Sequence, residues 1–161
     1  MMKVSDIEEM VKVCDVDFVC SNEKSEMFLV LESILQIRER NKKFNRKEWE
    51  SRCTESDNML HAYCLLVKGT LEDRLAELAI ILFSLAHKYQ MNMGSLQLGK
   101  TDAKTIFLDD MLMSMVKIEL SHYKVYKKII ILVGMLCDYC ISNGIDLKWF
   151  VKQRKHFLYE R

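Results

Sequence analysis

The chain has no proline in 161 residues and only five glycines. Proline breaks helices, and both residue types mark turns and loops. A chain with so few of them lacks the turn residues that all-β and doubly wound α/β folds need. Half of the residues are hydrophobic and 29% are charged, which is a globular composition. We therefore predict one all-α domain over residues 1–161, built from five to seven long helices with short connections.

Apolar spacing and capping residues place the helices. The strongest begins at Thr70, where Thr70 caps and Asp73 fills the capping-box position, and it carries a wide apolar stripe to about residue 90. A second helix, over about 125–142, is apolar almost all round, which predicts a buried central helix. Gly69 is expected to end the helix before Thr70, and Asp146 to cap the last one. The other predicted helices cover about 5–16, 22–41, 59–68, 105–122 and 146–159, with a loop near 90–104 and an ambiguous segment over 48–57.

Charge gives no general attraction for polyanions. Lys and Arg number 24 against 23 Asp and Glu, a formal net charge of +1. We expect no nucleic-acid partner, and any anion site must be local. The basic stretch 38–47 is interpreted as a solvated helix end, with a phosphate contact as the alternative. The longest apolar run is too short to span a bilayer, so no membrane partner is expected.

Cysteine usage indicates a reducing compartment. The N-terminus, MMKVSDIEEM, lacks the apolar segment of an export signal, so we expect a cytoplasmic protein with reduced thiols. Cys137 and Cys140 form a CxxC in the middle of a helical pattern. A redox CxxC sits at a helix start after a strand, so we interpret these two as core residues.

Carboxylates are the remaining chemical lead. Acids three or four residues apart on a helix project from one face and can hold a divalent cation. The candidates are Glu23 with Glu26, Glu32 alone, and Asp73 with Glu77. The alternative is that these acids are solvated, or that they suit a helix N-terminus electrostatically.

Two segments carry a family resemblance. Residues 68–92, KGTLEDRLAELAIILFSLAHKYQMN, and 143–161, NGIDLKWFVKQRKHFLYER, resemble the second motif region and the closing segment of MazG-like all-α nucleotide pyrophosphohydrolases. The resemblance implies an oligomeric helical bundle that hydrolyses nucleoside triphosphates to monophosphate and pyrophosphate. It implies Mg²⁺ held by carboxylates of two helices. In this chain the corresponding metal ligands would be Glu32, Asp73 and Glu77.

The chain departs from the family pattern at its acids. Where the family has ELAD, this chain has Arg74-Leu75-Ala76-Glu77, and Leu35 stands three residues after Glu32. A cation in a metal site adds positive charge where negative charge is required. We also expect Arg74 to pair with Glu77 on the same helix face. Weak Mg²⁺ binding and slow or absent pyrophosphate release are the predicted results.

Three functions stay open from the sequence. The first is a divergent Mg²⁺-dependent pyrophosphohydrolase that acts on a nucleotide. The second is a non-catalytic helical module for oligomerisation or protein interaction, and the third is a regulator that offers a groove to a partner helix. The high apolar content predicts a homo-oligomer in any of these cases. Convergence of Glu32, Asp73 and Glu77 in space would favour the enzyme.

Overall fold

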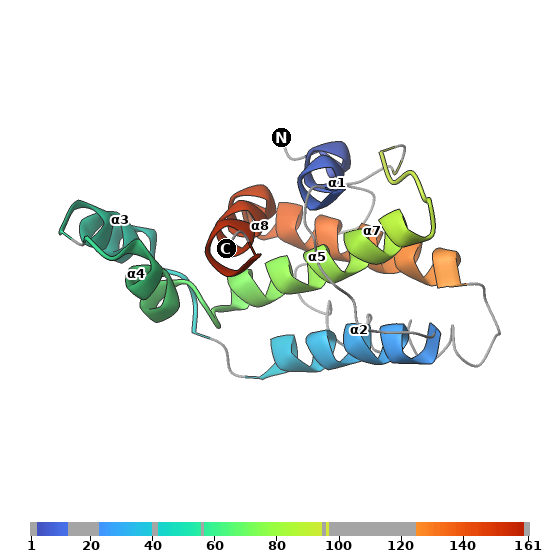
Figure 1. Cartoon of the computed structure of the whole chain (residues 1–161), viewed down its shortest axis with the longest axis horizontal. Helices are drawn as coiled ribbons and strands as arrows, with labels where there is room; N and C mark the ends of the chain where they lie inside the picture. Colours follow the sequence, from blue (N-terminus) through green and yellow to red (C-terminus); the bar gives the residue numbers. More distant parts are fainter. Residues whose placement is uncertain are drawn as a thin grey trace.

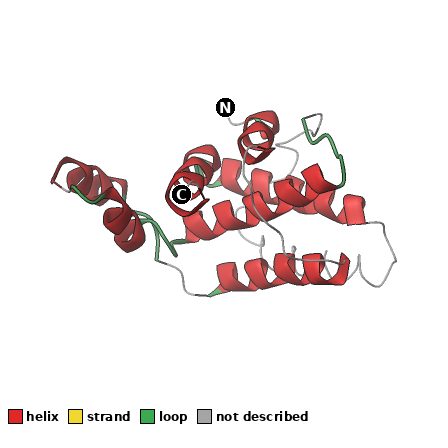
Figure 2. Cartoon of the chain, viewed as in Figure 1, coloured by secondary structure: helices red, strands yellow, loops and turns green. Residues whose placement is uncertain are grey.

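The computed structural model describes residues 3–12, 23–39, 42–55, 57–94, 96 and 125–159. Within these ranges the chain forms seven α-helices and a short π-helical segment, and no strand (Figure 2). The prediction of an all-α fold with five to seven helices is confirmed. The elements are α1 (Val4–Lys12), α2 (Glu23–Arg38), α3 (Arg46–Glu55), α4 (Met59–Leu66), α5 (Leu71–Lys88), α7 (Val125–Ser142), α8 (Leu147–Arg154) and the π-helical segment Lys155–Tyr159.

Helix α5 is the centre of the fold. It begins at the predicted cap, because the Thr70 hydroxyl oxygen accepts a hydrogen bond from the backbone N–H of Asp73 at 3.2 Å. The other bond of the predicted capping box is not formed: the Thr70 N–H donates to the Val67 carbonyl, and the Asp73 carboxylate accepts from the Gly69 N–H. More than half of its residues are buried, and α1, α2, α7 and α8 all pack against it (Figure 1). A helix surrounded in this way must be apolar on several sides, which the wide stripe of leucine and alanine provides.

Helix α7 lies alongside α5 and is buried along one stripe. That stripe consists of Ile129, Leu132, Val133, Leu136, Cys137 and Cys140. Ile130 and Ile131 are instead 38% and 42% exposed. The predicted buried central helix is therefore buried along the stripe that packs on α5, whereas Ile130 and Ile131 lie outside that stripe.

Helix α8 returns across the centre after a tight turn. Gly144 has a φ of +65°, a left-handed conformation that favours glycine. Asp146 then caps α8, accepting a hydrogen bond from the Trp149 N–H at 3.1 Å, as predicted. The helix packs against α5 and α1. Its buried face consists of Leu147, Phe150, Val151 and Arg154.

Helices α3 and α4 form a hairpin that extends away from the other helices (Figure 1). Aromatic rings hold its base to the C-terminal region: Trp49 packs on Trp149 with ring centroids 6.1 Å apart, and Tyr63 stacks on Phe157 at 4.8 Å. Gly69, with a φ of +80°, follows the end of α4 as predicted. Helix α3 falls largely on the segment that the sequence left ambiguous.

Several predictions lie outside the described residues. These are the helix over 105–122, most of the loop near 90–104, and residues 13–16 of the first helix. Among the helices that are described, none is by itself long and apolar enough to cross a membrane. The segments Lys127–Ser142 and Leu147–Tyr159 reach that length and hydropathy only when counted together, and they are bent by 113°.

Candidate functional site

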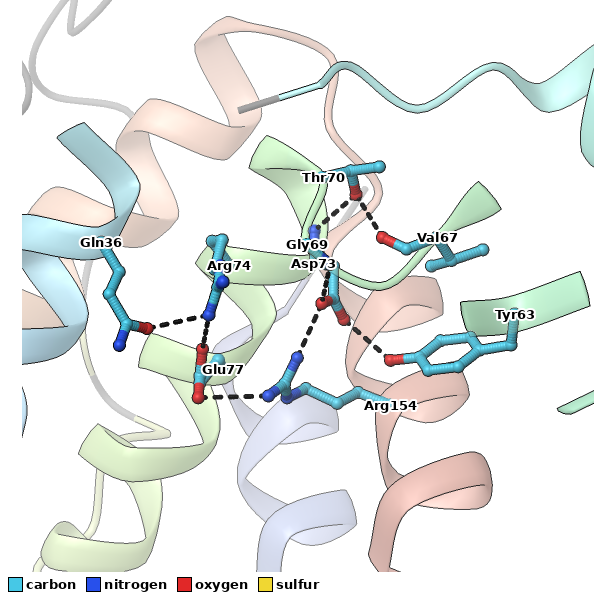
Figure 3. Close-up of polar contacts among 9 residues, drawn as sticks. All are labelled: Gln36, Tyr63, Val67, Gly69, Thr70, Asp73, Arg74, Glu77 and Arg154. Carbon is cyan, nitrogen blue, oxygen red and sulfur yellow. Dashed lines mark hydrogen bonds and ion pairs between the residues drawn. The ribbon is translucent and has the colours of Figure 1, made fainter. Parts of the chain in front are cut away.

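Asp73 is a fully buried carboxylate in the first turn of α5. One of its oxygens accepts a hydrogen bond from the Tyr63 hydroxyl at 2.8 Å. The other accepts from the Gly69 backbone N–H at 2.9 Å and from Arg154 at 2.7 Å (Figure 3). A buried carboxylate is tolerated only when donors satisfy it in this way. Three donors from three segments therefore hold the Asp73 side chain in place.

Arg154 joins the two acids that the sequence singled out. Its guanidinium reaches from α8 to the Asp73 carboxylate at 2.7 Å and to the Glu77 carboxylate at 3.1 Å (Figure 3). The Arg154 side chain is only 8% exposed. Burial alone lowers the pKa of the guanidinium, but Asp73 and Glu77 outweigh it, and the net pKa is raised. Arg154 is therefore a permanent cation between two carboxylates.

Arg74 completes the cluster on the side of α2. Its guanidinium donates to Gln36 at 2.8 Å and to the second oxygen of Glu77 at 3.2 Å. The predicted pairing of Arg74 with Glu77 is confirmed. We call Asp73, Arg74, Glu77 and Arg154 the four-charge cluster. Its two carboxylates and two guanidiniums balance in formal charge.

Tyr63 connects the α3–α4 hairpin to this cluster. It is fully buried, donates its hydroxyl hydrogen to Asp73, and stacks on Phe157. Burial, followed by the negative charge of Asp73, raises the pKa of the Tyr63 hydroxyl above its ordinary value. Tyr63 therefore stays a neutral donor at physiological pH.

The structure brings together two of the three predicted metal ligands. Asp73 and Glu77 meet through Arg154, whereas Glu32 is exposed on α2. Instead of Glu32, α2 contributes the amide of Gln36 to the cluster. The alternative pair Glu23 and Glu26 lies outside the residues whose side chains are described.

The donor set does not suit Mg²⁺. Mg²⁺ needs carboxylate or water oxygens in a close octahedron. Here both oxygens of Asp73 and both oxygens of Glu77 already face hydrogen-bond donors or guanidinium groups. In the described part of the chain, no three His, Cys, Asp or Glu side chains are grouped so that they could hold a metal ion. Mg²⁺ binding by this chain stays a prediction.

Sequence reasoning missed Tyr63, Gln36 and Arg154. A signal existed for Arg154 alone. It follows Leu147, Phe150 and Val151 at helical spacing, so it is a cation on the apolar stripe of its helix. A charged residue in that position is buried and needs a partner, although the spacing does not say which one.

Cys137 and Cys140 are buried core residues, as predicted. Both are free thiols. Burial, with a smaller contribution from Asp138, raises the pKa of Cys137 to about 12, and burial also raises that of Cys140. Thiols with raised pKa values are poor nucleophiles and poor metal ligands at neutral pH. The two cysteines of the CxxC therefore contribute to the packing of α7 against α5.

No family model, curated protein or solved structure matches the chain.

Proposed function

We propose that the chain is a divergent MazG-like helical bundle in which Mg²⁺-dependent hydrolysis of nucleoside triphosphates is weakened or lost. The observation that carries the proposal is the position of Arg154, whose guanidinium contacts both Asp73 and Glu77. The resemblance would make these two acids metal ligands. In this chain a buried cation takes the position that a divalent ion would need.

Electrostatics supports a structural role for the acids. A metal ion entering the cluster would meet two guanidiniums within reach of its ligands. Displacing Arg154 from Asp73 would remove one of the two carboxylate partners of a buried guanidinium. Breaking a buried ion pair by removing one partner costs about 3–5 kcal/mol. The four-charge cluster therefore favours the arrangement in which arginine, and not metal, neutralises the carboxylates.

Pyrophosphate release measures this proposal directly. The purified chain is incubated with a panel of nucleoside triphosphates and Mg²⁺ or Mn²⁺, beside Glu77→Gln and the matched control Glu50→Gln on the exposed side of α3. We expect background turnover, equal in all three proteins. Saturable turnover that Glu77→Gln abolishes and Glu50→Gln leaves intact would overturn the proposal and restore the enzyme.

A second candidate is a non-catalytic oligomerisation or interaction module. It is favoured by the outer face of α4, where Leu60 and Leu65 are 45% and 52% exposed on the extended hairpin. Exposed apolar side chains on a projecting hairpin suit contact with another protein surface. We propose a second copy of the chain as the partner, in agreement with the predicted homo-oligomer.

The cytoplasm is the proposed compartment. Cys53, Cys64, Cys137 and Cys140 are all free thiols. Thiols persist in reducing compartments, whereas an oxidising compartment favours disulfides.

A further inference from the structure

A cavity of about 540 Å³ lies between α1 and the C-terminal helical region. Its lining consists of Met10, Lys148, Lys152, Gln153, Lys155 and His156. A volume of this size falls in the range of sites for small ligands, roughly 300–1,000 Å³.

The cationic lining follows from the amphipathic pattern of α8. Lys148 and Lys152 are four residues apart and lie on one side of the helix, with Lys155 one turn further. Arg154 lies on the opposite side and is buried against α5. The cavity is therefore separate from the four-charge cluster, although the same helix supplies residues to both.

Positive charge is concentrated in this cavity. Three lysines line it, and its lining contains no carboxylate. The formal net charge of the chain is only +1, so this is a local feature of the kind that an anion site requires here. A carboxylate oxygen of Asp6 lies 3.6 Å from the Lys148 Nζ atom and offsets part of the positive charge at one edge of the cavity. That pair is half exposed, with Lys148 at 52%, so solvent weakens its interaction.

We propose that this cavity binds an organic phosphate of nucleotide size. Lysine ammonium groups bind phosphate as point charges, and Lys148, Lys152 and Lys155 bring such groups to one lining. The thioether of Met10 and the methylene stems of the lysines add apolar wall for the organic part of such a ligand. The proposal is independent of hydrolysis, because it concerns equilibrium binding away from Asp73 and Glu77.

Calorimetric titration with ADP in the presence of EDTA tests the site without metal. The proteins are the unmodified chain, the double variant Lys148→Gln with Lys152→Gln, and the control Lys47→Gln on the exposed side of α3. We expect the double variant to bind about tenfold more weakly, because two of the three ammonium groups are lost. Lys47→Gln should bind like the unmodified chain.

The variant Asp6→Asn tests the site through an expected gain in ADP affinity instead of a loss. Removing the carboxylate beside Lys148 should tighten ADP binding by about two- to threefold at low salt, and added NaCl should weaken binding in every protein. A variant that binds more tightly is not explained by loss of folding.

Titration with inorganic pyrophosphate tests whether the organic part of the ligand contributes to the affinity. We expect it to bind the same cavity more weakly than ADP, because it has nothing to pack on Met10. Equal affinity for pyrophosphate and ADP would overturn the assignment of an organic ligand. Equal ADP affinity of the double variant and the unmodified chain, or no saturable binding at millimolar ADP, would overturn the site and leave the lysines as solvated surface residues.

Discussion

The guanidinium of Arg154 is a buried cation that contacts two carboxylates from one face of α5. Its bond to Asp73 spans 81 positions of the chain. Ion pairs of this kind gain little over an apolar replacement of the whole set, yet they are costly to break one partner at a time. The contribution of Arg154 to stability therefore depends on whether Asp73 keeps its charge.

Substitution of Arg154 tests whether its contribution to stability depends on the charge of Asp73. We expect Arg154→Met to lower the free energy of unfolding by about 3–5 kcal/mol, because Asp73 is left charged and buried. Asp73→Asn added to Arg154→Met should recover part of the loss, since the amide carries no charge. Urea denaturation followed by circular dichroism measures both, with Arg52→Met on the exposed side of α3 as the control. If the changes in the free energy of unfolding caused by the two substitutions are strictly additive, Arg154 and Asp73 do not act as a coupled buried pair.

Tyr63 should give a pH-dependent contribution to stability. Its pKa is raised in the folded chain, so the neutral hydroxyl is favoured by folding. The resulting stability is fully present below the unfolded-state pKa of about 10 and is lost as pH rises above that value. We expect Tyr63→Phe to cost about 1–2 kcal/mol at pH 7 through the lost bond to Asp73. The difference between the two proteins should shrink above pH 10, and a constant difference from pH 7 to 11 would contradict this explanation.

Among the elements, the N-terminus of α5 joins several segments at one point. The Leu71 N–H donates to the Lys42 carbonyl at 2.9 Å, and the Glu72 carboxylate accepts from the Phe44 N–H at 3.0 Å. Thr70 caps the same turn, and its hydroxyl donates to the Val67 carbonyl at 2.7 Å. Backbone N–H groups at a helix start lack intrahelical partners, and the bonds to Lys42 and Thr70 satisfy those of Leu71 and Asp73. The bonds of Lys42 and Phe44 attach the preceding segment to the start of α5.

Removing the two confirmed caps should have unequal effects. We expect Thr70→Ala to lower the free energy of unfolding by about 1–2 kcal/mol, because Thr70 is buried and its hydroxyl makes two hydrogen bonds. Asp146→Ala should cost about 0.5–1 kcal/mol, because its cap is exposed. Thr70→Ser keeps the hydroxyl and serves as the control in the same urea titrations. A larger cost at Asp146 than at Thr70 would contradict the argument from burial.

For the whole molecule, the surface retains several large apolar side chains. Among the residues that the structure describes, the exposed ones are Leu35, Leu60, Leu65, Tyr89, Ile130, Ile131 and Tyr159. They come from α2, α4, α7 and the ends of α5 and the π-helical segment, so more than one face is involved. Single exposed apolar residues are normal, so it is their number and their spread over several elements that favour contact with another protein surface.

We expect a homodimer or a larger homo-oligomer in solution. Light scattering at micromolar concentration should give at least twice the 19.0 kDa mass of the chain. Changing Leu60 and Leu65 to Lys should shift the mass to that of the monomer if α4 forms the interface, whereas Ile130→Lys with Ile131→Lys serves as the comparison on α7. A 19.0 kDa species for the unmodified chain would contradict the prediction.

The fold class could be predicted from the sequence because it depends on properties of residues that are close together in the chain. The lack of proline, the apolar spacing of α5 and α7, and the caps at Thr70 and Asp146 are properties of neighbouring residues. They depend on contacts within one helix turn, so a sequence shows them directly. The ion pair between Arg74 and Glu77 could be predicted for the same reason, because residues three apart share a helix face.

Only the tertiary structure decided what neutralises the acids. Asp73 as a lone residue is compatible with a metal ligand, a helix-start charge or a buried ion pair, and nothing within its own helix distinguishes these. The choice depended on Arg154 and Tyr63, which reach it from α8 and α4. Such contacts follow from how helices pack, because burial removes water and makes the identity of the distant partner decisive for each charge.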